Sequence, residues 1–319
     1  MGRCRQGVLR RSRGEVRQRR ARCRRQGRAL SREASIIAAL RGLADTPAAR
    51  GLADDAAVIE IGGEALVLTH DAMVEGVHWL PGQDLADVAW KLVAANLSDL
   101  AAKGAEPIGV LLGFMLGAED ERFVTGLGEV LHEYLVPLLG GDTVAGGPPR
   151  TFGLTAVGRA THRPVPDRRG ARAGDTLWLT GPVGAAMLGF EALRDGTAAD
   201  SAAFRRPRPL LSEGRALAPL VSAMMDVSDG LLLDARRLAD ASGVTLAIDT
   251  AAVPISAPGD RRAEALRWGD DYQLLFTLPV HWKPPIPAHQ IGEARPFAGS
   301  SLLINGTAPA PDDSLGYQH

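Results

Sequence analysis

Short clusters that combine aspartate with small or apolar residues constrain this 319-residue chain more than any other feature. They lie at apparent ends of strands and helices, in residues 54–57, 69–71, 96–99, 140–143, 226–230 and 269–272. Hard cations take oxygen ligands, and Mg²⁺ normally bridges carboxylates to substrate phosphates. The clusters therefore predict a fold that gathers carboxylates around Mg²⁺ and handles a nucleotide through the metal.

Length and composition place the chain among globular proteins. Its length fits one large domain or two ordinary domains, and two is the better expectation. Apolar residues make up 45% and charged residues 23% of the chain, and no apolar run approaches the ~20 residues of a membrane span. We therefore expect a soluble protein.

Charge is distributed unevenly, although the formal net charge is −1. Residues 1–28 contain twelve arginines and one glutamate, so the rest of the chain carries 24 basic and 36 acidic side chains by difference. Such an acidic body argues against nucleic acid as its main ligand, because phosphate backbones are held by lysine and arginine. It favours the binding of cations.

The arginine-rich segment 1–28 has neither the apolar core of a secretory signal nor an apolar periodicity. Disorder is the simplest interpretation, and a transit peptide, an RNA-binding arm and a start codon assigned too far upstream are the alternatives. We favour the last, because residues 29–40 look like a folded start. Both cysteines, Cys4 and Cys23, lie in this segment, which excludes disulfides and thiol catalysis from the rest and suggests the cytoplasm.

Hydrophobic periodicity predicts alternating helices and strands. In the first half it predicts helices at 31–43, 84–103 and 121–138, and strands at 65–69, 108–116 and 151–158. In the second half it predicts strands at 176–180, 224–227 and 244–248, and helices ending at 193 and spanning 229–241. A stretch rich in proline and arginine, residues 161–170, separates the halves. The pattern predicts an α/β or α+β layer fold.

Some clusters indicate a site by position alone. Asp71 is expected at the exit of the 65–69 strand, where ligand sites of α/β sheets lie. Asn96 and Asp99 share one face of a helix rich in alanine and leucine, which indicates a buried polar site. Residues 226–230 predict a strand exit followed by a helix N-terminus, where phosphate binds readily.

Other clusters also fit simpler interpretations. Asp54 and Asp55 are costly to bring together without a cation, but a solvated loop or a helix cap is the commoner setting. His78 can donate to a phosphate or be a packed loop histidine. Residues 140–143 allow close approach to a ligand or form an ordinary turn. None of the three lysines lies in a P-loop motif, so a metal would have to neutralise bound phosphates.

Taken together, the clusters resemble those of thiamine-monophosphate kinase, a family related to aminoimidazole ribonucleotide synthetase. The resemblance spans residues 29–317 and is strongest in three strings, residues 69–71, 74–79 and 96–105. It implies ATP-dependent phosphorylation of thiamine monophosphate to thiamine diphosphate by direct in-line transfer, the last step of thiamine diphosphate biosynthesis. It also implies several Mg²⁺ ions and ATP as co-substrate, and it leaves a K⁺ requirement open.

The resemblance also assigns roles to residues. The implied Mg²⁺ ligands are Asp55, Thr69, His70, Asp71, Asp99, Asp142, Asp226 and Asp229. The implied ATP contacts are Gly141, Asp142, Arg168 and Ser228, with Arg169 as the alternative to Arg168. The implied substrate contacts are His78, Asp270 and Tyr317. No general base is implied, because a phosphate oxygen is ionised near neutral pH and transfer rests on a metal clamp held by Asp71, Asp99 and Asp226.

The family pattern further implies an organisation. Residues 29–160 would pair into a homodimer through a shared β-barrel, residues 170–305 would form a C-terminal α/β domain, and the tail 306–319 would bring Tyr317 to the substrate. Thiamine monophosphate and ATP are then the expected partners, without nucleic acid or membrane.

Three positions depart from the family pattern. Ala53 replaces a glycine, His70 a threonine and Asp270 a glutamate. His70 is compatible with metal binding through its backbone carbonyl, and Asp270 is one methylene shorter than the usual residue. The enzyme alternative is a synthetase of the same superfamily, and the alternative of another class is a catalytically silent nucleotide-binding regulator. Selenophosphate synthetase and the hydrogenase-maturation relative are disfavoured because their cysteines are missing.

Overall fold

The computed structural model describes residues 32–318, so the predictions for residues 1–28 and for an N-cap at Ser31 lie outside it. Helix α2 (Arg32–Arg41) confirms the helix predicted at 31–43 and belongs to a unit that ends at Leu43. The second unit begins at Ala44 and contains the sheets. No helix of the described range combines the length and apolar character that crossing a membrane requires.

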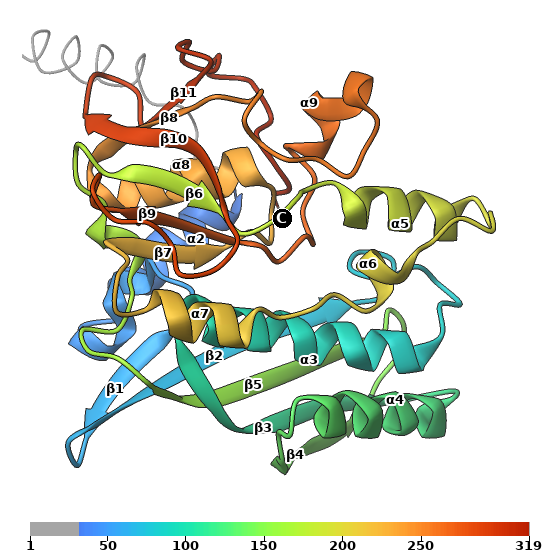
Figure 1. Ribbon diagram of the computed structural model, residues 1–319. Coiled ribbons are helices and arrows are strands. Elements are labelled where there is room, and N and C mark those ends of the chain that lie inside the picture. Colours follow the sequence, from blue (N-terminus) through green and yellow to red (C-terminus); the bar gives the residue numbers. More distant parts are fainter. Residues whose placement is uncertain (1–31, 319) are drawn as a thin grey trace, which may run out of the picture. The chain divides into compact units, whose positions relative to one another are not determined.

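A five-stranded sheet forms the first half of the second unit (Figure 1). Its strands lie in the order β1 (Ala57–Ile61), β2 (Glu64–Val74), β5 (Thr151–Ala160), β3 (Ala105–Leu116) and β4 (Leu138–Ala145). Neighbouring strands are antiparallel except for β3 and β4, which are parallel. The strands predicted at 65–69, 108–116 and 151–158 are present, each longer than predicted.

Helix α3 (Leu85–Ala102) packs on this sheet, beside α4 (Asp120–Glu133). Its ends follow from the sequence, because Asp84 accepts the N–H of Ala86 and Gly104 takes a left-handed φ of 58° beyond the last turn. The helix is buried almost all round, since β2 and β5 contact it on the side of the first sheet and β7 and α7 on the side of the second. The helix predicted at 84–103 is therefore confirmed.

A six-stranded sheet forms the second half. Its order is β11 (Leu302–Ile304), β8 (Val244–Ile248), β10 (His289–Pro296), β6 (Thr176–Leu179), β9 (Leu274–Leu278) and β7 (Ala223–Asp226). Its helices are α5 (Ala185–Arg194), α6 (Ala202–Arg205), α7 (Leu211–Leu217), α8 (Leu231–Ser242) and α9 (Arg262–Ala265). Short 3₁₀ turns are η1 (Pro47–Leu52), η2 (Arg168–Gly170) and η3 (Gly259–Arg261). Strands β6, β7 and β8 were predicted, whereas β9, β10 and β11 were not.

Two large hydrophobic cores and one small cluster, formed by Met187, Ala257 and Ala265, lie among the described residues of this unit. One lies around α3 and reaches Trp178, Met224 and Phe276 of the second sheet, so it joins the two sheets. The other lies between the second sheet and α8. Because most strand pairs are antiparallel, the α+β alternative describes the fold better than the parallel α/β one.

Two local predictions were wrong. Asp71 lies inside β2 and not at its exit, because β2 pairs with β5 as far as Val74, and its side chains alternate between buried and accessible positions. The helix predicted at 121–138 ends at Glu133, since Leu135 has a left-handed φ of 53° and Pro137 follows. Residues 140–143 consequently belong to strand β4 and not to a turn.

Candidate active site

Three carboxylates from distant parts of the sequence meet between the two sheets. Asp55 precedes β1, Asp99 lies on α3 and Asp226 ends β7. One carboxylate oxygen of each lies within 4.8 Å of the others. We call Asp55, Asp99 and Asp226 the three-acid cluster. Its donors are all hard oxygens, which are the ligands that Mg²⁺ prefers.

Burial makes two of these carboxylates, Asp99 and Asp226, and the neighbouring Asp71 unfavourable as free anions. It raises the pKa of Asp226 to about 8, and the charge of Asp55 adds to the rise. Burial likewise raises the pKa of Asp99 well above its usual value, and neighbouring Asp71 and Asp226 add to it. Burial also raises the pKa of Asp71 to about 6. A divalent cation would reverse this penalty, because it favours the ionised form of every carboxylate around it.

Strand β2 carries three predicted Mg²⁺ ligands, and the side chains of two of them lie on the face of the strand toward the three-acid cluster. The hydroxyl of Thr69 donates to the carboxylate of Asp99. Alternate residues of a strand face opposite sides, so Asp71 shares the face of Thr69 and the His70 side chain points the other way. There His70 Nδ1 lies 2.9 Å from Thr155 Oγ1. The side chain of His70 therefore lies on the face of β2 opposite to Thr69.

Helix α3 supplies the buried polar site that the sequence predicted. Asn96 accepts the backbone N–H of Asp71 through Oδ1 at 3.1 Å. Ser98, which was not singled out, donates through Oγ to Asp226 Oδ2 at 2.6 Å. Both side chains are fully buried. They hold one backbone segment and one carboxylate of the site in place.

Two cations neutralise part of this acidic region. Arg168 Nε lies 2.8 Å from Asp55 Oδ1. Lys103 Nζ, which is fully buried, lies 2.6 Å from Asp55 Oδ2 and 2.5 Å from Asp54 Oδ1. Arg169, by contrast, pairs with a neighbouring aspartate on the surface. Of the two arginines that the sequence left open, Arg168 is the one that contacts the three-acid cluster.

Asp234 of α8 binds the backbone of the loop between β7 and α8. Its buried Oδ2 accepts the backbone N–H of Ser228 at 3.1 Å and of Asp229 at 3.0 Å. The carboxylate of Asp229 pairs with Arg237. The backbone N–H of Tyr317 donates to the carbonyl of Asp229 at 2.9 Å. The C-terminal tail therefore returns to this loop.

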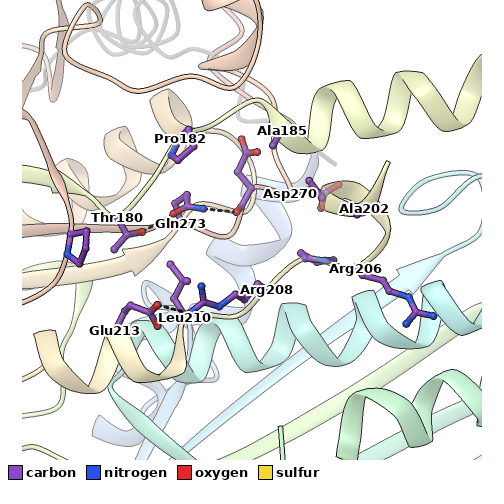
Figure 2. A pocket seen from close by; sticks show the side chains of 14 residues that line it. Thr180, Pro182, Ala185, Ala202, Arg206, Arg208, Leu210, Glu213, Asp270 and Gln273 are labelled. Atoms are coloured by element: carbon purple, nitrogen blue, oxygen red, sulfur yellow. Dashed lines mark hydrogen bonds and ion pairs between the residues drawn. The ribbon is translucent and has the colours of Figure 1, made fainter. Parts of the chain in front are cut away.

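Two predicted substrate contacts lie on loops of different sheets. Asp270 has a left-handed φ of 64°, its N–H donates to the carbonyl of Ser228 at 2.8 Å, and its Oδ1 accepts the Tyr272 hydroxyl at 3.1 Å. Figure 2 shows it at a pocket of about 480 Å³. His78 accepts the N–H of Val74 through Nδ1 at 3.0 Å. The neutral ring therefore carries its proton on Nε2, the nitrogen that can donate to a phosphate.

Gly141 and Asp142 lie on strand β4, and neither belongs to the three-acid cluster. A Cβ at Gly141 would lie 2.0 Å from the carbonyl oxygen of Leu112, so the pairing with β3 alone requires a glycine here. Asp142 is exposed, and its Oδ1 accepts the N–H of Thr143 at 2.9 Å. The glycine is explained by the sheet without a ligand.

Comparison with known proteins adds to this geometry. The chain matches the family models AIR synthase related protein, N-terminal domain, over residues 53–160, and AIR synthase related protein, C-terminal domain, over residues 172–283. Over 287 residues it is 37% identical to thiamine-monophosphate kinase of Escherichia coli (strain K12), covering 80% of this chain and 87% of the relative. The chain belongs to the thiamine-monophosphate kinase family.

Further members of the thiamine-monophosphate kinase family agree. The protein of that name from Caulobacter vibrioides is 39% identical over 287 residues, which cover 81% of each chain. A solved structure described as AaThiL complexed with AMPPCP and TMP superposes with a TM-score of 0.77 at 28% identity, covering 86% of this chain and 94% of the other. The two-domain fold that the sequence resemblance implied is confirmed.

Besides Ser98, three charged residues around this family's site were not identified from the sequence. They are Lys91, Lys103 and Asp234, each of which holds a predicted site residue or its loop. Their partners are distant in sequence or are backbone groups, so no local motif marks them. A buried charge is the signal that reveals them, and it appears only in the folded chain.

Proposed function

We propose that this protein transfers the γ-phosphoryl group of ATP to thiamine monophosphate and forms thiamine diphosphate. The observation that carries the proposal is the three-acid cluster beside Arg168, in a chain 37% identical to thiamine-monophosphate kinase of Escherichia coli. The related structure with AMPPCP and TMP supports an ATP-type donor and the acceptor. We place the reaction in the cytoplasm, where ATP and Mg²⁺ are available.

Mg²⁺ is the metal that the donor set fits. The three-acid cluster offers only oxygen ligands, and burial disfavours the anions of Asp99 and Asp226 without a cation. Further ligands in the proposal are Thr69, Asp71, Asp142, Asp229 and the backbone carbonyl of His70. Bound Mg²⁺ would screen the repulsion between the two substrates and stabilise charge on the phosphoryl group in transfer.

The chain's own residues bind and orient the two anionic substrates. Arg168 exchanges Asp55 for an ATP phosphate, while Ser228 and Gly141 line the nucleotide. His78 donates through Nε2 to the acceptor phosphate. Asp270, which lines the pocket shown in Figure 2, contacts the acceptor. Tyr317, which does not line that pocket, stacks on one of the acceptor's aromatic rings from the C-terminal tail. Binding places the attacking phosphate oxygen in line with the γ-phosphorus, so the reaction no longer depends on a random encounter of two substrates. This positioning supplies a large part of the catalysis of phosphoryl transfer.

The transfer itself needs no strong base. An ionised oxygen of the acceptor phosphate attacks the γ-phosphorus, and the bond from that phosphorus to the β–γ bridging oxygen breaks. ADP leaves with the electron pair of that bond. Because no proton is removed from the attacking oxygen near neutral pH, the residues at the site have to position and neutralise charge only.

We also propose that two copies associate through the first sheet. Strand β4 is one of the two edge strands of that sheet, and all eight of its residues are exposed. Apolar side chains lie along it, with Leu139 53% and Val144 50% exposed. A long exposed edge with apolar side chains is a template for pairing with another chain. A second copy supplies a matching edge.

The test is a direct assay of the full chain. Purified protein is incubated with ATP, MgCl₂ and thiamine monophosphate, in KCl and in NaCl, and thiamine phosphates are separated by chromatography. We expect thiamine diphosphate from wild type, none with EDTA, and none from Asp71→Asn. The matched control is Asp195→Asn, an exposed aspartate paired with adjacent Arg194, which should keep full activity.

Other outcomes would overturn the proposal in distinct ways. Consumption of ATP without thiamine diphosphate would indicate a synthetase of the same superfamily. ATP binding without turnover would indicate a silent nucleotide-binding protein. Unchanged activity of Asp71→Asn would remove the acidic site from the mechanism.

A further inference from the structure

Lys91 is a buried cation that the phosphoryl transfer described above does not use. It lies on α3 with its side chain 1% exposed. Its Nζ lies 2.8 Å from Asp270 Oδ2, 3.0 Å from the carbonyl oxygen of His78 and 3.7 Å from the centroid of the Phe204 ring. An ammonium has three N–H donors, so two hydrogen bonds and one aromatic face account for its surroundings.

The two hydrogen-bond acceptors of Lys91 belong to two different loops, and each loop carries a predicted substrate contact. His78 follows β2 of the first sheet, and Asp270 precedes β9 of the second. We propose that Lys91 is a positioning residue that fixes these loops relative to each other and thereby shapes the binding site of the acceptor substrate. This inference rests on the proposed function, since it concerns binding of thiamine monophosphate.

The carboxylate of Asp270 is partly exposed and yet is bound at both oxygens, which a purely structural ion pair does not require. Its side chain is 29% exposed and reaches the pocket of Figure 2, although its partner Lys91 is buried. Lys91 fixes one oxygen, and the Tyr272 hydroxyl fixes the other at 3.1 Å. Protein groups therefore orient both oxygens of this carboxylate while part of it stays exposed to the pocket. Such an arrangement preorganises the carboxylate for binding a ligand in the pocket.

The backbone of His78 is held in the same manner. Lys91 binds its carbonyl, while the N–H of Val74 binds its Nδ1 at 3.0 Å. The ring and the main chain of His78 are thus both restrained before any ligand arrives. Without Lys91 the ring contact persists, but the loop loses its connection to Asp270.

Lys91 contacts none of the proposed ATP residues among the hydrogen bonds and ion pairs of the described residues. Arg168 pairs with Asp55, and the N–H of Ser228 is held by Asp234. The carbonyl of Ser228 accepts the backbone N–H of Asp270, a main-chain contact that does not involve the carboxylate bound by Lys91. Loss of Lys91 should therefore weaken binding of the acceptor and spare that of ATP. This selectivity separates positioning from a general loss of stability.

Lys91→Met keeps the length of the side chain and removes its charge. With wild type active, we expect its KM for thiamine monophosphate to rise at least about tenfold while its KM for ATP changes less than about twofold. Titration with thiamine monophosphate alone, followed by tryptophan fluorescence, should show the same rise in Kd. The matched variant is Lys103→Met, on the same helix and equally buried, which pairs with Asp54 and Asp55 and should weaken binding of Mg²⁺ and ATP instead.

Folded Lys91→Met with wild-type KM and Kd for thiamine monophosphate would overturn the inference, and so would an equal rise in both KM values. If this variant does not fold, Phe204→Leu keeps the charge and removes the ring beside it. We expect a smaller selective rise in the KM for thiamine monophosphate, and an unchanged value overturns the inference. Wild type that forms no thiamine diphosphate would instead overturn the proposed function.

Discussion

Arg168 and Asp55 neutralise each other across the candidate active site, with Arg168 Nε 2.8 Å from Asp55 Oδ1. The arginine is the proposed contact of ATP, and the aspartate is a proposed ligand of Mg²⁺. Asp55 therefore occupies the position that an ATP phosphate would take beside Arg168, and Arg168 occupies the position that Mg²⁺ would take beside Asp55. Binding of nucleotide and metal has to open this pair, so the two events should be linked.

Arg168→Gln tests that role. Loss of a charge-assisted hydrogen bond costs about 1.5–3 kcal/mol, so we expect the KM for ATP to rise on the order of 10-fold to 100-fold. Arg169→Gln is the matched control, because Arg169 pairs with Asp167 on the surface and should change the KM less than about twofold. Steady-state kinetics with varied ATP measures both. A larger effect at Arg169 would reverse the assignment.

Asp234→Ala should disorder the loop that carries Ser228 and Asp229. Two backbone N–H groups and Arg237 lose their common acceptor, and we expect weaker binding of ATP together with a lower melting temperature. Asp240→Ala lies on the same helix, is exposed and should change neither. Fluorescent nucleotide titration and thermal unfolding check the pair. Wild-type nucleotide affinity in folded Asp234→Ala would contradict this role.

Asp271→Asn should alter the pH dependence of stability. Burial raises the pKa of Asp271 to about 7 in the folded protein, although hydrogen bonds from the N–H groups of Gly184 and Ala186 lower it in part. In the unfolded chain the pKa is near 3.8. The folded state therefore holds a proton that the unfolded state releases, and this stabilisation is complete below about pH 4 and lost as pH rises through 7. Asparagine has no such proton, although its oxygen can still accept from Gly184.

The measurement is urea unfolding of wild type and Asp271→Asn at several pH values between 5 and 8. Other buried carboxylates contribute equally to both proteins, so the difference between the two curves isolates Asp271. We expect the free energy of unfolding of the variant to gain on wild type as pH rises. Parallel curves would show that Asp271 is ionised throughout this range.

Val144→Glu tests the proposed association through strand β4. A charge in the middle of an apolar interface is buried without a partner, so we expect the variant to be monomeric where wild type is dimeric. Leu135→Glu is the control, because Leu135 is exposed at the end of α4 and lies outside β4. Light scattering after size-exclusion chromatography gives the mass of each. A monomeric wild type would exclude the dimer.

Local signals were enough to predict the helix that organises the site. The cap at Asp84, the apolar spacing and Gly104 together fix both ends of α3, so Asn96 and Asp99 were placed on one face correctly. Strand β4 could not be found this way, because Gly140 and Gly141 are poor strand formers. It exists because β3 pairs with it, which is a relationship between distant segments.

The acidic residues were predictable as a group, but their supports were not. The repeated aspartates show in the sequence that carboxylates are abundant near strand and helix ends. Lys103 has no such signal, since a lysine is usually exposed and its partner Asp54 lies 49 residues away. The side of β2 that His70 faces was equally hidden, because a strand's register is set by its neighbours.

Helix α3 carries both Lys91 and Asp99, so one rigid element spans the proposed sites of acceptor and metal. They are eight positions apart in the sequence, which corresponds to ~12 Å along the helix axis. Deleting or inserting one residue between them would turn one end by about 100° relative to the other and move both groups out of register. The length of this stretch of chain is therefore fixed by the distance between the proposed acceptor site and the proposed metal site.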